Sequence, residues 1–322
     1  MTDDRLSWRP VDVALAAALA ALLGCIGTAS GCGSVPPVDH STLGRRLAEQ
    51  AESAWRLGRY TTAANRLAEA VRHLRAADDL PAVASALHDR GVILTVAGDC
   101  GSAQLDLAES AVLHRRQGRR RELALNLLAM ARCDVDTGDP AISRRHLDEA
   151  GALGAALNDG AIEARALAGR AALQAAAGDT RGARASCAAA AKHAKAARDP
   201  GSSAQVAHNI ARLDAREGHH GAAARGFLAA AASYGEAGDH EGLASALGAA
   251  AVSLTASGEV DALRLAELYQ RAGHAAIAAL RPQWAAQHFA AAASAYDRAG
   301  QPGLAEQCRQ RGRVALQRAP DP

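Results

Sequence analysis

The sequence predicts an all-α protein, an α-solenoid built from about seven helix-turn-helix repeats. Glycine recurs every 40 residues along most of the chain, and residues of fixed size recur at helical spacing on both sides of each glycine. The composition is rich in alanine and only 3% aromatic, which suits closely packed helices better than a sheet. A unit copied in tandem presents a long surface, which favours a binding protein over an enzyme. The repeated glycines are Gly58, Gly98, Gly138, Gly178, Gly218 and Gly258.

Residues 1–32 have the composition of an export leader. Arg5 and Arg9 precede an uncharged apolar run at 13–23, and small residues follow it. Even when it is extended to Ala29, the apolar segment is short for a membrane span, which needs about 20 residues. We therefore expect this segment to direct export rather than to span a membrane.

Two cysteines in the leader are candidate lipidation sites. Residues 29–32 (Ala-Ser-Gly-Cys) and 22–25 (Leu-Leu-Gly-Cys) both resemble the lipobox of bacterial lipoproteins, in which the cysteine is lipidated and becomes the mature N-terminus. Cys32 is preferred because small residues precede it and a Gly/Ser/Pro-rich tether, residues 33–40, follows. Cys25 is the alternative because it has the more usual leucine three places earlier. An ordinary cleaved signal with incidental cysteines remains open.

The repeats begin after the tether and occupy residues 41–317. A small residue stands seven places before each anchor glycine and a mostly large one nine places after it, so a first helix ends at the glycine and a second helix follows. An acid after the anchor, at Asp99, Asp139, Asp179 and Glu259, is expected to cap the second helix. Gly and Pro in the linkers are expected to stop one helix before the next begins.

The last units are less regular than the others. The sixth unit slips after its anchor, and a one-residue shift to Ala262 partly restores its pattern. A seventh pair is expected at about 283–299 and 304–317, where it would cap the stack. The final residues, 318–322, are expected to form a disordered tail.

The repeated columns resemble the tetratricopeptide repeat family, in its long, 40-residue class. The resemblance covers residues 41–317, although the family's aromatic positions are mostly vacant, with Tyr60 and Phe227 as exceptions. It implies a right-handed superhelix in which the first helices line the concave face, where peptides or partner segments dock. The family's strict carboxylate clamp of lysines and asparagines is not reproduced in this sequence.

One face of the first helices is the predicted partner-binding groove. Positions 13, 10, 6 and 3 before each anchor cluster about 120° from the packed face. This face carries more arginines than acids, with an apolar floor in the middle units, so we predict a protein or extended peptide partner with acidic side chains or a carboxylate. The alternative is that each arginine is solvated or pairs with an acid on a neighbouring helix. The predicted groove residues are Arg45, Trp55, His88, Leu125, Leu128, Arg132, Arg165, His208 and Arg212.

Several other functions are not expected. A formal net charge of +2 gives little reason to expect a nucleic-acid partner. No phosphate loop, dinucleotide fingerprint or His-Glu-x-x-His motif is present, so neither catalysis nor a cofactor is predicted. No metal site is predicted, because His219 and His220 are interpreted as having no Cys or acid at ligand spacing. The basic run 114–121 is interpreted as a solvated helix end, with contact to anionic lipid or cell-wall polymer as its alternative.

The remaining cysteines lie far apart and are interpreted as buried thiols. A disulfide between Cys100 and Cys133 is left open, because one opens a second helix and the other lies in the next first helix.

The sequence thus predicts a non-enzymatic protein–protein interaction scaffold. It would be lipid-anchored in the cell envelope, on the periplasmic face of a bacterial membrane (preferably the outer one), and would assist assembly of an envelope complex. A secreted or periplasmic location is the alternative to the anchor. The alternative function is a cytoplasmic regulatory module that senses peptides or small ligands.

Overall fold

The computed structural model describes residues 38–258 and 261–317, and the statements below refer to these residues. The chain divides into one unit at 1–39 and a second at 40–322, and every described helix belongs to the second. The leader with Cys25 and Cys32, most of the tether, Glu259 and the tail lie outside the described residues.

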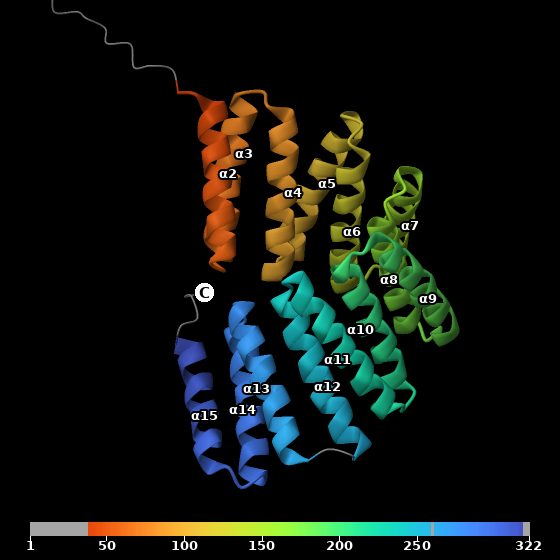
Figure 1. The fold of residues 1–322 in the computed structure, drawn as a ribbon. Coiled ribbons are helices and arrows are strands. Elements are labelled where there is room, and N and C mark those ends of the chain that lie inside the picture. Colours follow the sequence, from red (N-terminus) through yellow and green to blue (C-terminus); the bar gives the residue numbers. More distant parts are fainter. Residues whose placement is uncertain (1–37, 259–260, 318–322) are drawn as a thin grey trace, which may run out of the picture. The chain divides into compact units, whose positions relative to one another are not determined.

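The described residues form fourteen α-helices and no strand, in agreement with the predicted fold class. Figure 1 shows them in chain order. Their bounds are α2 (His40–Arg56), α3 (Tyr60–Ala76), α4 (Leu80–Ala97), α5 (Cys100–Arg116), α6 (Arg120–Thr137), α7 (Pro140–Leu157), α8 (Gly160–Ala176), α9 (Thr180–Ala197), α10 (Pro200–Arg216), α11 (His220–Ala237), α12 (His240–Ser257), α13 (Ala262–Ala278), α14 (Pro282–Arg298) and α15 (Pro302–Gln317).

Consecutive helices pack as hairpins, beginning with α2 against α3 and ending with α14 against α15. We call the even-numbered helices first helices and the odd-numbered ones second helices. From α2 to α12 each first helix also contacts the first helix of the next pair. The first helices therefore present a continuous face of the solenoid, as the repeat pattern requires.

The anchor glycines recur because each ends a first helix in the left-handed conformation. Their φ angles lie between 68° and 89°, a region that a residue with a Cβ adopts only with strain. The connections between pairs also contain a left-handed residue, but it is glycine only at Gly118 and Gly238. Asp78, Asn158, Arg198 and Leu280 occupy the other connections, which explains why only the anchor column is constant.

Aspartates cap many of the helices. Asp99, Asp139 and Asp179 accept hydrogen bonds from backbone N–H groups of the following second helices, as predicted. The same role is played at other helix starts by Asp79, Asp159, Asp199, Asp239 and Asp261. The sequence predicted that the linker prolines would stop the preceding helices, and this prediction is wrong. They lie in the first turn of the next helix, where the missing N–H costs nothing.

The crossings of the helix pairs combine a small residue with a large one. A Cβ added to Gly91 would lie 2.6 Å from Leu107 Cγ, and one added to Gly169 would lie 2.6 Å from Leu147 Cδ2. The same relation joins Gly273 to Phe289 in the last units. Close approach at these points buries apolar side chains that single helices would leave in water.

The connection between α13 and α14 contacts the first two helix pairs, and we call this contact the seam. Tyr60 Oη donates to the carbonyl oxygen of Ala279 at 3.1 Å, and Arg281 Nη2 donates to the carbonyl oxygen of Val96 at 2.7 Å. Arg281 also pairs with Glu241 at 3.1 Å. The side chain of Leu280 occupies the space above Gly58, where an added Cβ would lie 1.7 Å from Leu280 Cδ1. Side chains far apart in the sequence thus meet at the two ends of the repeat array.

Cys100, Cys133, Cys187 and Cys308 are buried thiols in this structure, as preferred from the sequence. Cys100 and Cys133 belong to the same small apolar cluster with Ala103. Among the described helices, none combines the length and the apolar character that crossing a membrane requires.

Candidate functional site

A groove with a volume of about 450 Å³ opens on the face of the first helices. Its apolar floor is formed mainly by α4 and α6, and α8 and α10 provide its polar far side. The larger apolar and polar side chains that line it are His88, Val92, Leu125, Leu128, Arg132, Val135, Arg165 and Gln205.

The structure brings together part of the predicted set. Of the predicted groove residues, those that line this groove are His88, Leu125, Leu128, Arg132 and Arg165. Arg212 borders a much smaller depression, and this depression shares Ala172 with the groove. Arg45, Trp55 and His208 do not line the groove.

A buried hydrogen-bond chain fixes His88 at the edge of the groove. His88 Nδ1 lies 2.8 Å from Asn126 Oδ1, and Asn126 Nδ2 donates to Ser110 Oγ at 3.1 Å. Ser110 Oγ donates in turn to the carbonyl oxygen of Ala84 at 2.7 Å. Because the amide nitrogen of Asn126 is already a donor, its oxygen accepts from His88, which places the imidazole proton on Nδ1.

Two of the predicted groove arginines pair with helix-capping aspartates, so their guanidinium groups are not free to pair with a partner. Arg45 Nη2 lies 2.9 Å from Asp79 Oδ2, and Arg165 Nη2 lies 3.2 Å from Asp199 Oδ2. Asp79 and Asp199 cap α4 and α10, so these pairs join neighbouring first helices. Arg45 also holds the pKa of Asp79 below its usual range by hydrogen bonding to its carboxylate. Both arginines therefore follow the alternative stated for the sequence, in which an arginine of this face pairs with an acid on a neighbouring helix.

Arg132 and Arg212 differ from these two. Both side chains are exposed, and neither forms an ion pair with a described side chain. Arg132 lies beside the apolar floor formed by Leu125, Leu128 and Val135. The groove therefore combines apolar contacts with a guanidinium that is not neutralised by a described carboxylate.

His208 is not a cation in the groove. Its ring packs edge-on against Phe227 at 5.1 Å and against Tyr234 at 6.1 Å between centroids. Burial, with a smaller contribution from Arg212, lowers the pKa of His208 to about 4. The ring is therefore neutral near pH 7, because desolvation penalises the imidazolium. His208 was predicted as a groove residue, but it packs against the aromatic rings of α11 instead.

Trp55 belongs to the apolar packing of the first pair rather than to the groove. Its ring lies 5.1 Å from that of Tyr60, and it packs against the cluster that contains Leu47 and Leu67. The groove residues predicted from the sequence do not include Leu147, which lines the groove from the second helix α7. Its column, nine places after the anchor, predicted a large side chain at the crossing, and Gly169 leaves room for it to reach the face.

The basic run is only partly solvated. His114 is 1% exposed, and burial lowers its pKa, so it is not part of a charged helix end. Arg115 pairs with Glu149 at 2.6 Å, and Arg121 pairs with Asp159 at 3.0 Å. The run thus includes one core residue and two contacts to neighbouring helices.

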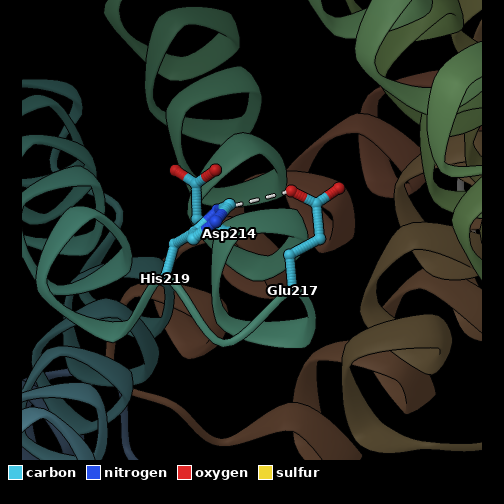
Figure 2. Close-up of side chains that lie close together, drawn as sticks. All are labelled: Asp214, Glu217 and His219. Atoms are coloured by element: carbon cyan, nitrogen blue, oxygen red, sulfur yellow. Dashed lines mark ion pairs between the residues drawn. The ribbon is translucent and has the colours of Figure 1, made fainter.

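Two acids do lie beside His219, contrary to the interpretation of the sequence. Figure 2 shows Asp214, Glu217 and His219, whose side-chain ligand atoms lie within 4.8 Å of one another. Arg184 already binds both carboxylates, at 2.6 Å from Asp214 and 2.5 Å from Glu217. This guanidinium holds the pKa of Glu217 below its usual range. The cluster is explained by a bridge between α9 and α10, and the site needs no further cation.

No family model matches the chain, and no curated protein matches it. Its structure is similar to that of a Rap protein complexed with the competence and sporulation factor, with a TM-score of 0.61 and 12% identity over 86% of this chain and 75% of that chain. It is also similar to the apo form of RapI, with a TM-score of 0.58 and 9% identity over 85% and 97% of the two chains.

A third similar structure is a signal transduction ATPase with a tetratricopeptide repeat sensor from Pyrococcus horikoshii. The TM-score is 0.55 and the identity 12%, over 86% of this chain and 43% of that chain. Similarity at such low identity is evidence of fold and not of activity. The described chain therefore has the fold of a tetratricopeptide-repeat-like α-solenoid.

Proposed function

We propose that this chain is a non-enzymatic interaction protein that binds an extended peptide segment in the first-helix groove. The observation that carries the proposal is the apolar floor at Leu125, Leu128 and Val135 beside Arg132. A segment with apolar side chains and a nearby carboxylate would fill the floor and pair with the guanidinium in two parallel hydrogen bonds. His88 adds an imidazole ring whose orientation is fixed by Asn126.

Arg212 is proposed as a second contact along the same segment. Its depression and the groove share Ala172, so a segment running from α6 towards α10 would reach both arginines. Arg165 lies between them but is already paired with Asp199. Arg165 is therefore assigned a role in joining α8 to α10, and not the main role in binding.

Selection of peptides from a random displayed library tests this proposal. Peptides selected on the wild-type chain are expected to combine apolar and acidic residues. Their affinity, measured by fluorescence polarisation, is expected to fall by about tenfold or more when Arg132→Glu and Arg212→Glu are combined, because attraction becomes repulsion at both contacts.

The matched control is Arg72→Glu combined with Arg225→Glu. Both side chains are exposed on second helices, and the change in net charge is the same. Selected peptides that lack acidic residues, or that bind the groove variant and the control equally well, would count against the groove. Circular dichroism establishes that both variants keep their helix content.

We also propose that the mature protein is lipid-anchored at Cys32, with Cys25 as the alternative, and assists assembly of an envelope complex. The support is the leader's basic start, apolar run and lipobox-like motifs. Labelling of bacterial cells with an alkyne fatty acid is expected to mark the wild-type protein and Cys25→Ser but not Cys32→Ser. The reverse pattern would assign Cys25, and an unlabelled wild-type protein would refute the anchor.

A cytoplasmic peptide-sensing regulator is the second candidate. It is favoured by the similarity in fold to a Rap protein that was solved with the competence and sporulation factor bound. Cell fractionation distinguishes the two candidates, because a cytoplasmic sensor would be recovered as a soluble chain that retains residues 1–32. An anchored protein would be recovered with membranes and without the leader.

A further inference from the structure

A second cavity lies at the seam, away from the first-helix groove. Its volume is about 660 Å³, larger than that of the groove, and it is lined by residues of the first pair and of the last two pairs. Its apolar wall includes Leu57, Ile277, Leu280 and Val314. Leu57 is 59% exposed and Ile277 is 44% exposed, so part of this wall is open to solvent. The size lies within the range of cavities that hold small molecules.

The cavity wall is held in a specific arrangement. Leu280 has a φ of 57°, a conformation that leucine rarely adopts, and its side chain packs over Gly58. The Tyr60–Ala279 hydrogen bond and the contacts of Arg281 with Val96 and Glu241 surround this point. The contacts of Ala279 with Tyr60 and of Arg281 with Val96 join the connection between α13 and α14 to the first two pairs beside the cavity.

The charged lining residues are all cationic. Arg59 and Arg311 contribute guanidinium groups, and none of the described residues that line the cavity is acidic. Arg59 forms no ion pair with a described side chain, and Arg311 Nη1 lies 3.0 Å from His274 Nε2. Since a guanidinium only donates, His274 accepts through Nε2 and is neutral. Burial and Arg311 both lower the pKa of His274, in agreement with this assignment.

Two helix starts add to the positive potential of the cavity. Arg59 directly precedes α3, and Pro282 is the first residue of α14. Neither helix has a side-chain hydrogen bond at its N-cap, whereas many of the other described helices are capped by aspartate. The partial positive charge of both helix ends is therefore not offset by a capping carboxylate.

We propose that the seam cavity binds a small amphiphilic carboxylate. Its apolar part would pack against Leu57, Ile277 and Val314, and its carboxylate would accept hydrogen bonds from Arg59 and Arg311. Charge complementarity selects this class of ligand: two guanidinium groups beside an apolar wall match one anionic head and one apolar body. The site is independent of peptide binding in the first-helix groove.

Isothermal titration of the full chain with decanoate and with uncharged decanamide tests the proposal. Wild-type protein is expected to bind decanoate about tenfold more tightly than decanamide, because only the carboxylate pairs with the arginines. Arg59→Gln combined with Arg311→Gln is expected to reduce the affinity for decanoate to that for decanamide. Leu57→Ser, a change of an exposed side chain, is expected to weaken both ligands.

Arg72→Gln combined with Arg225→Gln is the matched control, since it removes two exposed arginines away from the seam. The groove variant Arg132→Glu with Arg212→Glu is expected to keep its decanoate affinity, which separates this site from the groove. Equal affinity for decanoate and decanamide, absence of binding, or equal losses in the seam and control variants would overturn the proposal. Arg59→Gln alone replaces the double variant if circular dichroism shows that the latter is unfolded.

Discussion

Two regions of the solenoid share one backbone pattern but have different interiors. Between residues 95 and 143 the buried side chains include many polar groups, whereas the last units, from α11 to α15, bury a large cluster that is almost wholly apolar. The polar region contains Thr95, Asp106, Ser110, His114, Asn126, Asp134 and Ser143. Beyond residue 143, the described buried polar residues are Ser186, Ser202 and Ser253.

In the polar region, side chains join helices through directed hydrogen bonds. Asp134 accepts from Gln104 Nε2 and pairs with His146 Nδ1, both at 2.7 Å, which links α5, α6 and α7. Asp106 lies 3.3 Å from Arg90, and burial raises the pKa of its carboxyl despite that arginine. Each contact needs its own partner, because a buried polar group without one is costly.

In the apolar region, the helices are joined by close packing of apolar side chains rather than by hydrogen bonds. Phe289 is fully buried and faces Gly273, and alanines of α11 to α14 fill the surrounding space. The comparison shows that helices can pair at this repeat spacing with either a hydrogen-bonded polar interior or a packed apolar interior. The polar interior makes helix pairing more specific, and the apolar interior contributes more stability per contact. The groove lies over the polar region, where a hydrogen-bonded core orients His88.

The largest effect is expected from Phe289→Ala in the apolar region. It removes a fully buried ring and leaves a cavity, so the free energy of unfolding should fall by about 3–5 kcal/mol. Urea unfolding followed by circular dichroism measures the change. Leu105→Ala, at a side chain that is 75% exposed, is the control and should change stability by less than about 0.5 kcal/mol. Similar losses at both positions would contradict the apolar cluster as the main source of stability.

Acidification should destabilise the fold through His208. Its folded pKa of about 4 lies below the unfolded value of about 6.5, so the unfolded chain binds the proton first. The stabilising contribution is complete above pH 6.5 and is lost as the pH falls towards 4, by about 3 kcal/mol in total. Urea unfolding of wild type and His208→Leu at several pH values measures it. A variant with an unchanged pH slope between 6.5 and 4 would refute this assignment.

A smaller loss is expected from Asn126→Leu in the polar region. The leucine fills a similar volume but leaves His88 and Ser110 without their shared partner, which should cost about 1–3 kcal/mol. The exposed Asn65 offers the control Asn65→Leu. Denaturant midpoints report stability. If Asn126→Leu left stability unchanged, the hydrogen bonds of the polar interior would not stabilise it, and the proposed difference between the two regions would be wrong.

The smallest effect is expected from an ion pair on the surface of the polar region. Arg75 and Glu109 meet at 2.5 Å, but their side chains are 49% and 47% exposed. Solvent screening should limit their coupling to about 0.2–1 kcal/mol. A double-mutant cycle with Arg75→Ala and Glu109→Ala measures the coupling. A value above that of the Asn126 network would show that surface charge contributes more than the buried hydrogen bonds to joining the helices of this region.

Much of the fold could be predicted because its signals are local. A left-handed residue after a helix favours glycine, and a helix start favours aspartate, so Gly98 and Asp99 mark a turn without tertiary information. The spacing of small and large residues then placed Gly91 against Leu107. The linker prolines were misread because proline both ends and begins helices.

The candidate groove was predicted only in part. Helical periodicity placed His88, Leu125 and Arg132 on one face, but it could not tell which cations were neutralised by neighbours. Arg45 and Arg165 find their aspartates 34 residues away, and His208 is covered by rings of another helix. The approach of His274 and Arg311 to Leu57 at the seam has no sequence signal, since it joins the two ends of the array.

The sequence by itself determined the repeat, the helix ends and the face that each helix turns inward, because these depend on backbone conformation and on periodicity within a few residues. Only the tertiary structure decided which arginines remain unpaired, where the chain leaves cavities and how the first pair meets the last. Those properties depend on distances between residues that the chain separates widely. Such distances accumulate from small rotations between successive helix pairs and are not encoded at any single position.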